Sequence, residues 1–355
     1  MAAEPPRSPI GRLPVRKKLS RLLKLARGKK RGLVLTHDNP DPDSLASAVA
    51  LALVLERKAG LSMQVAYGGI IGRAENLAFV RVLKLPVEPI SKIVFDDYDL
   101  LALVDTQQNV GNHALPIHLT ADIVIDHHPL REEDAVPVAF SDIGNTGATS
   151  TLLTQYLRAA RLEPGPELAT ALYYGIKADT RDLERQTRNP DVDSYLWLFP
   201  KIDRELLSKI EHPDVPARYF QLYHAAIERA KVFSTAVITD MSEVYSPDMV
   251  AEVAERLSFL DTAVWSLAYG SYRSQLYLSL RVSDRRMKAG KLIRDLTQDL
   301  GGSAGGHGSM AGARLPLYGT RQQRMSLKRE VVRRFKEALG IENERGSSLL
   351  STGEG

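Results

Sequence analysis

A short acidic stretch, residues 36–44, holds three side chains that could bind a metal ion: His37, Asp41 and Asp43. The apolar run just before it predicts a buried strand, and the residues after it, to Lys58, predict a helix. Two prolines stiffen the turn between them, so the three side chains can face one point at little entropic cost. A metal site is one interpretation. A proline-rich turn in which Asp43 only caps the helix is the other.

The same design recurs twice downstream. The apolar run 101–104 leads straight into Asp105, and the run 122–125 leads into Asp126, His127 and His128. In an open parallel sheet, ligands bind beyond the carboxyl ends of the strands, so three such endings can converge on one site. A fourth acid, Asp179, ends a helical run and could cover the site from the side. The recurrence favours the metal-site interpretation.

These motifs, in this order, resemble the successive motifs of the DHH phosphoesterase family. The glycine-rich stretch 305–312 resembles the signature of the DHH-associated C-terminal domain. The two domains occur together in nanoRNA phosphodiesterases, adenosine bisphosphate phosphatases and single-strand exonucleases. The resemblance covers roughly residues 32 to 320, and the set of four motifs is far more specific than any single member.

The resemblance implies a site with two divalent ions, usually Mn²⁺, with Mg²⁺ as an alternative. His37 and Asp41 would bind the first ion, whereas Asp43, His127 and Asp179 would bind the second. Further implied roles are a bridge between both ions for Asp105, a contact to the substrate phosphate for His128, orientation of the histidines for Asp126, and substrate contacts for Arg281, Gly305, Gly306 and His307. Independently of the resemblance, a site rich in carboxylates and without thiolates favours Mn²⁺ or Mg²⁺ over Zn²⁺.

The sequence departs from the family pattern at two positions. Arg181 follows the Asp-Thr of the fourth motif, where a glycine is common, and Met310 replaces a usual alanine in the glycine-rich stretch. Neither position is an expected metal ligand. Both are expected to lie beside the substrate.

The expected fold is α/β, with a parallel-sheet catalytic domain joined by a linker to a smaller α/β domain and the active site in the cleft between them. The expected boundaries are a basic arm at 1–32, the catalytic domain at 33–184, a proline-rich linker at 185–232, the DHH-associated domain at 233–320, and a basic helix with a disordered tail at 321–355. At 355 residues, the chain is long enough for two domains of ordinary size.

Two other features have competing interpretations. The hydroxyls and amides of residues 144–151 open a helix and could hold phosphate, but capping of the helix explains them better. Asp191 and Asp193 mimic a metal pair. Because no strand precedes them and no histidine lies beside them, they are interpreted as capping residues.

Charge is distributed unevenly along the chain. Residues 1–32 contain eleven Lys or Arg and a single acid, Glu4, so this segment carries +10 while the whole chain carries only +4. The stretch 16–25 has helical periodicity with its leucines on one side. A nucleic-acid-binding arm is one interpretation. An amphipathic helix packed on the catalytic domain is favoured, because no aromatic residue is interleaved for base stacking.

The expected function is metal-dependent hydrolysis of short single-stranded oligoribonucleotides or nucleoside 3′,5′-bisphosphates in the cytoplasm. The alternatives are hydrolysis of pyrophosphate or polyphosphate, and a nucleotide-binding regulator without catalysis. The glycine-rich stretch favours nucleotides. The sequence contains no run of about 20 apolar residues, so no membrane span is predicted. Cys is absent. A second copy of the chain is a further candidate partner.

Overall fold

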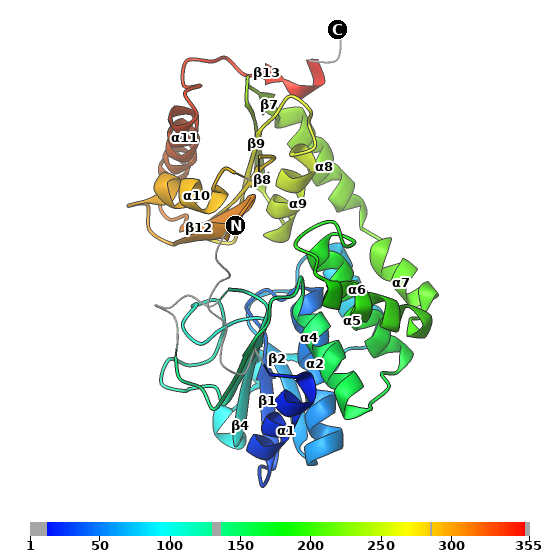
Figure 1. The fold of residues 1–355 in the computed structure, drawn as a ribbon. Coiled ribbons are helices and arrows are strands. Elements are labelled where there is room, and N and C mark those ends of the chain that lie inside the picture. Colours follow the sequence, from blue (N-terminus) through cyan, green and yellow to red (C-terminus); the bar gives the residue numbers. More distant parts are fainter. Residues whose placement is uncertain (1–12, 130–135, 285, 352–355) are drawn as a thin grey trace. The chain divides into compact units, whose positions relative to one another are not determined.

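The computed structural model describes residues 13–129, 136–284 and 286–351 of the chain. The chain forms two compact units, Met1–Pro213 and Asp214–Gly355, each with its own sheet (Figure 1). Among the described residues, no helix is both long enough and apolar enough to cross a membrane.

The first unit is built on a six-stranded parallel sheet with the order β3-β2-β1-β4-β5-β6. Its strands are β1 (Arg31–Leu35), β2 (Ser62–Tyr67), β3 (Val87–Pro89), β4 (Leu100–Val104), β5 (Ile123–Asp126) and β6 (Phe140–Ile143). The order reverses direction between β1 and β4, and such a reversal opens a crevice at the carboxyl ends of the two strands. The parallel α/β fold expected from the sequence is confirmed.

The helices of the first unit are α1 (Val15–Ala26), α2 (Pro42–Ala59), α3 (Ala74–Val82), α4 (Thr149–Ala160), α5 (Pro166–Thr180), α6 (Asn189–Leu198) and α7 (Arg204–Glu211), with 3₁₀ turns η1 (Ile90–Lys92), η2 (Phe95–Asp97) and η4 (Phe199–Lys201). Side chains alternate across the sheet, as the period of a strand requires. Val34 joins the core beneath α1, α2, α4 and α5, whereas Leu33 and Leu35 join a smaller core on the opposite face, with Ile90 and Phe95 packed against it. Both faces of β1 are therefore buried.

Helix α1 is the amphipathic helix favoured from the sequence. Leu19, Leu22 and Ala26 are buried in the core of the first unit. Lys18 is also buried, and its ammonium lies 2.8 Å from Asp142 Oδ1 on β6. The described part of the basic segment is thus packed against the catalytic unit, and residues 1–12 lie outside the described residues.

The second unit contains a mixed seven-stranded sheet with the order β11-β12-β10-β9-β8-β7-β13. Its strands are β7 (Lys231–Val232), β8 (Ala236–Glu243), β9 (Trp265–Tyr272), β10 (Gln275–Val282), β11 (Ser303–His307), β12 (Met310–Pro316) and β13 (Ser347–Ser348). Helices α10 (Ala289–Thr297) and α11 (Arg321–Ala338) cover one face, and α8 (Ala217–Arg229) and α9 (Asp248–Leu257) cover the other (Figure 1). Each face buries its own apolar core.

Two segments are more ordered than the sequence suggested. The segment 185–232, expected as a linker with helical runs near 204–210 and 217–232, also forms α6, besides α7 and α8, and Leu198 and Ile210 of this segment are buried in the core of the first unit. The prolines there begin or follow helices instead of marking a long loop. The tail, expected to be disordered, contributes β13, which pairs with β7, and the 3₁₀ turn η5 (Leu349–Ser351). Residues 352–355 lie outside the described part.

Candidate metal centre

The carboxyl ends of three neighbouring strands deliver the predicted ligands to one place. His37 follows β1 and Asp105 follows β4, on the two sides of the reversal in strand order. Asp126 ends β5 and is followed by His127 and His128. Two acids come from the start of α2, Asp41 and Asp43, and Asp179 comes from the last turn of α5.

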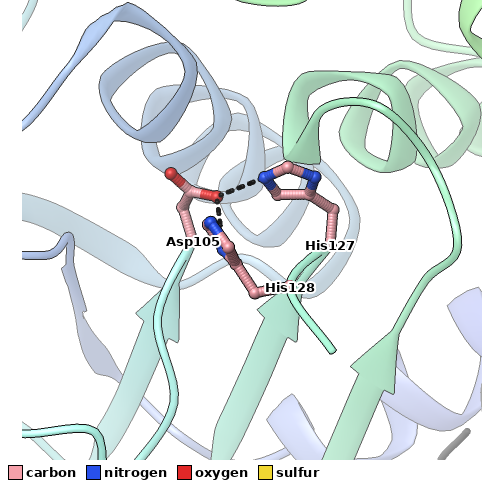
Figure 2. A group of neighbouring side chains, drawn as sticks. All are labelled: Asp105, His127 and His128. Atoms are coloured by element: carbon pink, nitrogen blue, oxygen red, sulfur yellow. Dashed lines mark ion pairs between the residues drawn. The ribbon is translucent and has the colours of Figure 1, made fainter. Parts of the chain in front are cut away.

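All six predicted metal ligands fall into two neighbouring groups, and a third group, Asp105 with His127 and His128, connects them. The first group is His37, Asp41 and Asp105, and the second is Asp43, His127 and Asp179; within each group the candidate ligand atoms lie within 4.8 Å of one another. Asp105 Oδ2 lies 3.6 Å from His37 Nε2, and Asp105 Oδ1 lies 3.6 Å from His127 Nε2. Each oxygen of Asp105 thus faces a different group. Figure 2 shows His127 and His128 beside this carboxylate.

Hydrogen bonds orient two histidines toward the centre. Nδ1 of His37 lies 2.9 Å from the carbonyl of Asp38, and Nδ1 of His127 lies 3.2 Å from the carbonyl of Thr146. These contacts place the proton on Nδ1 and leave Nε2 for a metal, as is usual for metal-binding histidines. Nε2 of His127 is buried and lies 3.1 Å from Asp179 Oδ2 without hydrogen-bond geometry to it, as two ligands that face a common metal position would.

The charges of the centre are strongly coupled. Burial raises the pKa of Asp43 well above its usual value, and the charges of Asp105 and Asp179 raise it further. Burial opposes the charging of His37, but hydrogen bonds to Asp105 and Asp41 outweigh it and raise the pKa of His37. Divalent cations would neutralise the crowded carboxylates, and this set of oxygens with two imidazoles fits Mn²⁺ or Mg²⁺.

The start of α4 holds two of the carboxylates in place. The backbone amides of Thr149 and Ser150 each donate a 2.7 Å hydrogen bond to Asp43, and the hydroxyl of Thr149 donates to Asp105 Oδ1 at 2.8 Å. Helix N-termini favour anions, and here the anion is a protein carboxylate. Because Asp43 uses these amides, the structure favours capping over phosphate binding for residues 144–151. Asp41, not Asp43, is the N-cap of α2.

Asp191 caps helices, as interpreted from the sequence. It is fully buried and forms a capping box with Arg188 at the start of α6. Its carboxylate also accepts hydrogen bonds from the amide of Gly147 and the hydroxyl of Thr151, at 2.8 and 2.6 Å. Asp191 therefore braces the loop before α4 and is not part of the metal groups.

A buried glutamine that sequence reasoning missed supports His128. Asp126 Oδ1 lies 2.8 Å from His128 Nδ1, and Asp126 Oδ2 accepts a 2.7 Å hydrogen bond from Gln107 Nε2. The same amide nitrogen of Gln107 lies 3.2 Å from the carbonyl of His128. Burial opposes the charging of His128, but the hydrogen bond to Asp126 outweighs it and raises the pKa of His128 to about 9. The only sequence signal for Gln107 is its position two residues after Asp105.

A pair of glycines brings the end of β2 against the first motif. The amide of Asn39 donates to the carbonyl of Gly68 at 3.0 Å, and the side-chain oxygen of Asn39 accepts from the amide of Ile70 at 2.9 Å. Gly69 has a φ of 69°, and a Cβ there would lie 2.8 Å from the Asn39 nitrogen. A glycine is therefore required where the turn 36–44 meets this loop.

The backbone is left-handed at the predicted ligand Asp105 and in the loop that follows the predicted ligand Asp179. Asp105 has a φ of 60°, which an aspartate tolerates better than most residues. Arg181, which replaces the family's glycine two residues after Asp179, has a φ of 49° and is followed by Asp182 at 56° and Leu183 at 68°. A glycine at 181 would adopt this conformation without strain, so the arginine is held there by the rest of the loop.

The predicted substrate contacts lie at one end of the sheet in the second unit. Met310 pairs with Arg281 on one side and with His307 on the other. Gly305 and Gly306 lie within the strand β11. A Cβ on Gly306 would clash with Met310 and Ala311, whereas a Cβ on Gly305 would meet open space.

Arg281 lies on β10 and is buried, although an arginine on a strand can also lie on the surface. It is only 7% exposed. Its guanidinium donates to Ser279 Oγ at 2.8 Å, to the carbonyl of Leu280 at 3.1 Å, and to the carbonyl of Ala251 in α9 at 3.4 Å. Arg281 therefore also holds β10 against α9.

The fold and the site define a metal-dependent phosphoesterase, and the chain belongs to the DHH family. Residues 31–176 match the model of the DHH family N-terminal domain, and residues 231–338 match the DHHA1 domain. A protein of Methanocaldococcus jannaschii is 32% identical over 93% of this chain and 68% of its own length.

Other relatives carry different activities in their names. A probable manganese-dependent inorganic pyrophosphatase of Listeria monocytogenes is 21% identical over 63% of this chain and 69% of its own length. The cyclic-di-AMP phosphodiesterase GdpP of Geobacillus thermodenitrificans is 26% identical over 66% of this chain and 38% of its own. These names do not agree on a substrate.

Solved structures show the same fold at low identity. An exopolyphosphatase-related protein from Bacteroides fragilis superposes with a TM-score of 0.67 and 14% identity, over 91% of this chain and 98% of its own. RecJ of Thermus thermophilus in complex with Mn²⁺ superposes with a TM-score of 0.53 and 18% identity, over 94% of this chain and 56% of its own. The resemblance to the DHH family is confirmed.

Proposed function

We propose that the protein is a manganese-dependent phosphodiesterase or phosphatase that acts on short oligoribonucleotides or nucleoside 3′,5′-bisphosphates. The observation that carries the proposal is the position of Asp105, whose two oxygens face the two groups of ligands. Such a carboxylate fits a bridge between two ions. Support for manganese comes from the chemistry of the donor set and from the names of the pyrophosphatase relative and of the RecJ complex.

The proposed ligands follow the two groups. His37 and Asp41 would hold the first ion, Asp43, His127 and Asp179 the second, and Asp105 both. Two bound ions would lower the pKa of a water molecule and neutralise charge on the phosphoryl group.

His128 has the properties of a phosphate-binding residue. The hydrogen bond to Asp126 outweighs burial and raises the pKa of His128, which favours the protonated ring with a proton on both nitrogens. Nδ1 faces Asp126, and the side chain is 42% exposed, so a substrate can reach it. A charged imidazolium can then donate a strong hydrogen bond to a phosphate oxygen.

A panel of substrates tests the proposal. Purified full-length protein, stripped of metal and reloaded with Mn²⁺, is assayed with a diribonucleotide, a nucleoside 3′,5′-bisphosphate, a cyclic dinucleotide, pyrophosphate and polyphosphate. We expect the first two to be hydrolysed fastest, and Asp105→Asn to abolish turnover. Asp193→Asn is the matched control, because this exposed acid lies outside the metal groups. Fastest turnover of pyrophosphate or polyphosphate would replace the proposed substrate class, and no turnover at all would favour a regulator.

We further propose that the second domain contributes substrate contacts through Arg281, Gly305, Gly306 and His307. The open space beside Gly305 supports close approach of a ligand to the backbone. Arg281→Ala is expected to cost about 2–4 kcal/mol in kcat/KM for a nucleotide, the range for a charged hydrogen-bonded pair. Hydrolysis of the small ester nitrophenyl phosphate should change little. Equal losses on both substrates would show that Arg281 only stabilises the fold.

A further inference from the structure

The second unit contains a cavity that no role of the metal centre requires. It has a volume of about 440 Å³, within the range of small-molecule sites. Its floor is formed by β8 and β9, which contribute Asp240 and Tyr269, and its wall is formed by α11. Arg281 reaches α9 on the opposite face of this sheet, so the cavity is separate from the proposed substrate contacts.

One part of the cavity is apolar and contains an aromatic ring. Tyr269 is half-buried on β9, and Met325 and Val332 lie on α11 at a spacing of two helical turns. Met325 is 43% exposed although it lines the cavity. A flat heterocycle can stack on a tyrosine ring and contact methionine and valine side chains.

The other part of the cavity is positively charged. Helix α11 contains seven Lys or Arg and two Glu. Lys328 is neutralised by Asp240, at 3.0 Å, and its ammonium lies 5.8 Å from the centre of the Tyr269 ring, which leaves the other face of that ring for a ligand. Among the described residues, Lys336 donates to the backbone carbonyls of Glu342 and Glu344, at 3.1 and 3.0 Å, and its ammonium lies 5.0 Å from the centre of the Phe233 ring. These contacts leave its charge in place. The cavity lining holds Lys328, Arg329, Arg333 and Lys336 against the two acids Asp240 and Glu342.

Arg329 is the cation most available to a ligand. Its side chain is exposed at the cavity, and it has no ion pair or hydrogen bond within the part of the chain that the structure describes. Arg333, next along the helix face, is already paired with Glu330 at 2.7 Å and with Glu337. The contacts of Lys328 and Lys336 hold the wall of the cavity in place. The positive charges of Arg329 and Lys336 are not neutralised by an ion pair among the described residues, so both can bind an anion.

We propose that this cavity binds a nucleotide, with the base on Tyr269 and Met325 and a phosphate at Arg329 and Lys336. An aromatic surface next to unneutralised cations matches both parts of a nucleotide. An isolated phosphate would leave the apolar part unused, and an apolar ligand would leave the charges unused. The nucleotide can be a free mononucleotide or the terminal nucleotide of a strand, because both present the same chemistry.

Binding and photolabelling of the full-length protein test the proposal. With EDTA present to stop hydrolysis, the probes are 8-azido-AMP and a pentaribonucleotide that ends in 8-azidoadenosine. We expect at least one probe to bind and to label peptides containing Tyr269 or Met325. Arg329→Glu, which reverses the charge, and Val332→Trp, which fills the cavity, should each raise the Kd about tenfold. The matched control is Arg324→Glu, an exposed arginine on the same helix that does not line the cavity.

Each outcome decides the matter. Binding of AMP alone would identify a site for free nucleotides, and binding of the pentanucleotide a site for strand ends. Labels confined to the first unit or to residues 305–307, or an equal loss of affinity in Arg324→Glu, would overturn the proposal. So would unchanged Kd values in both cavity variants. Turnover at the metal centre, measured in parallel with Mn²⁺, should be unchanged in the control Arg324→Glu; its absence in every variant would count against the proposed function alone.

Discussion

Removal of the Asp142 carboxylate should lower the free energy of unfolding by a large part of its total. Asp142 is fully buried, and its two oxygens accept hydrogen bonds from Lys18 Nζ and from the hydroxyl of Tyr156, both at 2.8 Å. In Asp142→Ala, the ammonium of Lys18 remains 6% exposed without its anion. Breaking a buried ion pair costs about 3–5 kcal/mol, and the lost partner of the hydroxyl adds about 1 kcal/mol. A domain is stable by only about 5–15 kcal/mol.

Urea unfolding of the single and double variants checks this reasoning. Asp142→Ala should lose about 4–6 kcal/mol in the free energy of unfolding. Lys18→Met/Asp142→Leu should recover most of this loss, because replacement of both charges by apolar groups is often neutral. Turnover at temperatures where the variants are folded should not change, since neither residue belongs to the metal groups. A loss below about 1 kcal/mol in Asp142→Ala, or a double variant as unstable as the sum of the singles, would refute the account.

Four further predictions concern the metal centre. Asp105→Asn should lower kcat/KM by a factor that corresponds to several kcal/mol of lost transition-state stabilisation, because one amide cannot neutralise two ions. The thermal unfolding curve should keep its cooperative shape. Near wild-type turnover would contradict the two-ion assignment. Chelation should remove activity, and Mn²⁺ should restore it better than Zn²⁺; full activity in demonstrably metal-free protein would be the opposite result. The affinity for Mn²⁺ should rise with pH above 6.5, because the pKa values of His37 and His127 are raised and a ligand imidazole must lose its proton. Calorimetric titrations at several pH values measure this affinity, and one that stays constant or falls with pH would contradict the prediction. Gln107→Leu should lower kcat about 10- to 100-fold through misorientation of His128 and leave Mn²⁺ affinity unchanged, as measured by steady-state kinetics and metal titration; a parallel loss of both would indicate a general structural role.

The convergence of the ligands was predictable because a simple geometric rule governs it. Strands that run parallel end at the same edge of a sheet, so His37, Asp105 and Asp126 had to lie near one another once their strands were identified. The sequence also predicted that α1 packs its leucines inward, since its periodicity is strong. These inferences depend on local pattern alone.

The remaining features depend on contacts between distant residues, which a single sequence does not reveal. Asp43 lies at the start of one helix but is bound by the amides that start another, 106 residues away. Gln107 reaches Asp126 across 19 residues, and no motif marks it. Prolines at 190, 200 and 213 suggested a linker because they punctuate the chain, but apolar residues between them bury against the first unit. Packing decided the structure there, and local propensity did not.

The dispersal of the ligands along the chain links metal binding to folding. His37 and Asp179 belong to the same centre although they lie 142 positions apart in the sequence, and the two oxygens of Asp105 face both groups. No short segment can therefore assemble the centre, and an unfolded chain would bind an ion only weakly. Each site that is saturated at a hundredfold excess over its Kd then adds about 2.7 kcal/mol to the free energy of unfolding. The concentration of free Mn²⁺ would set not only turnover but also the fraction of the first domain that is folded, and thereby its survival against proteolysis.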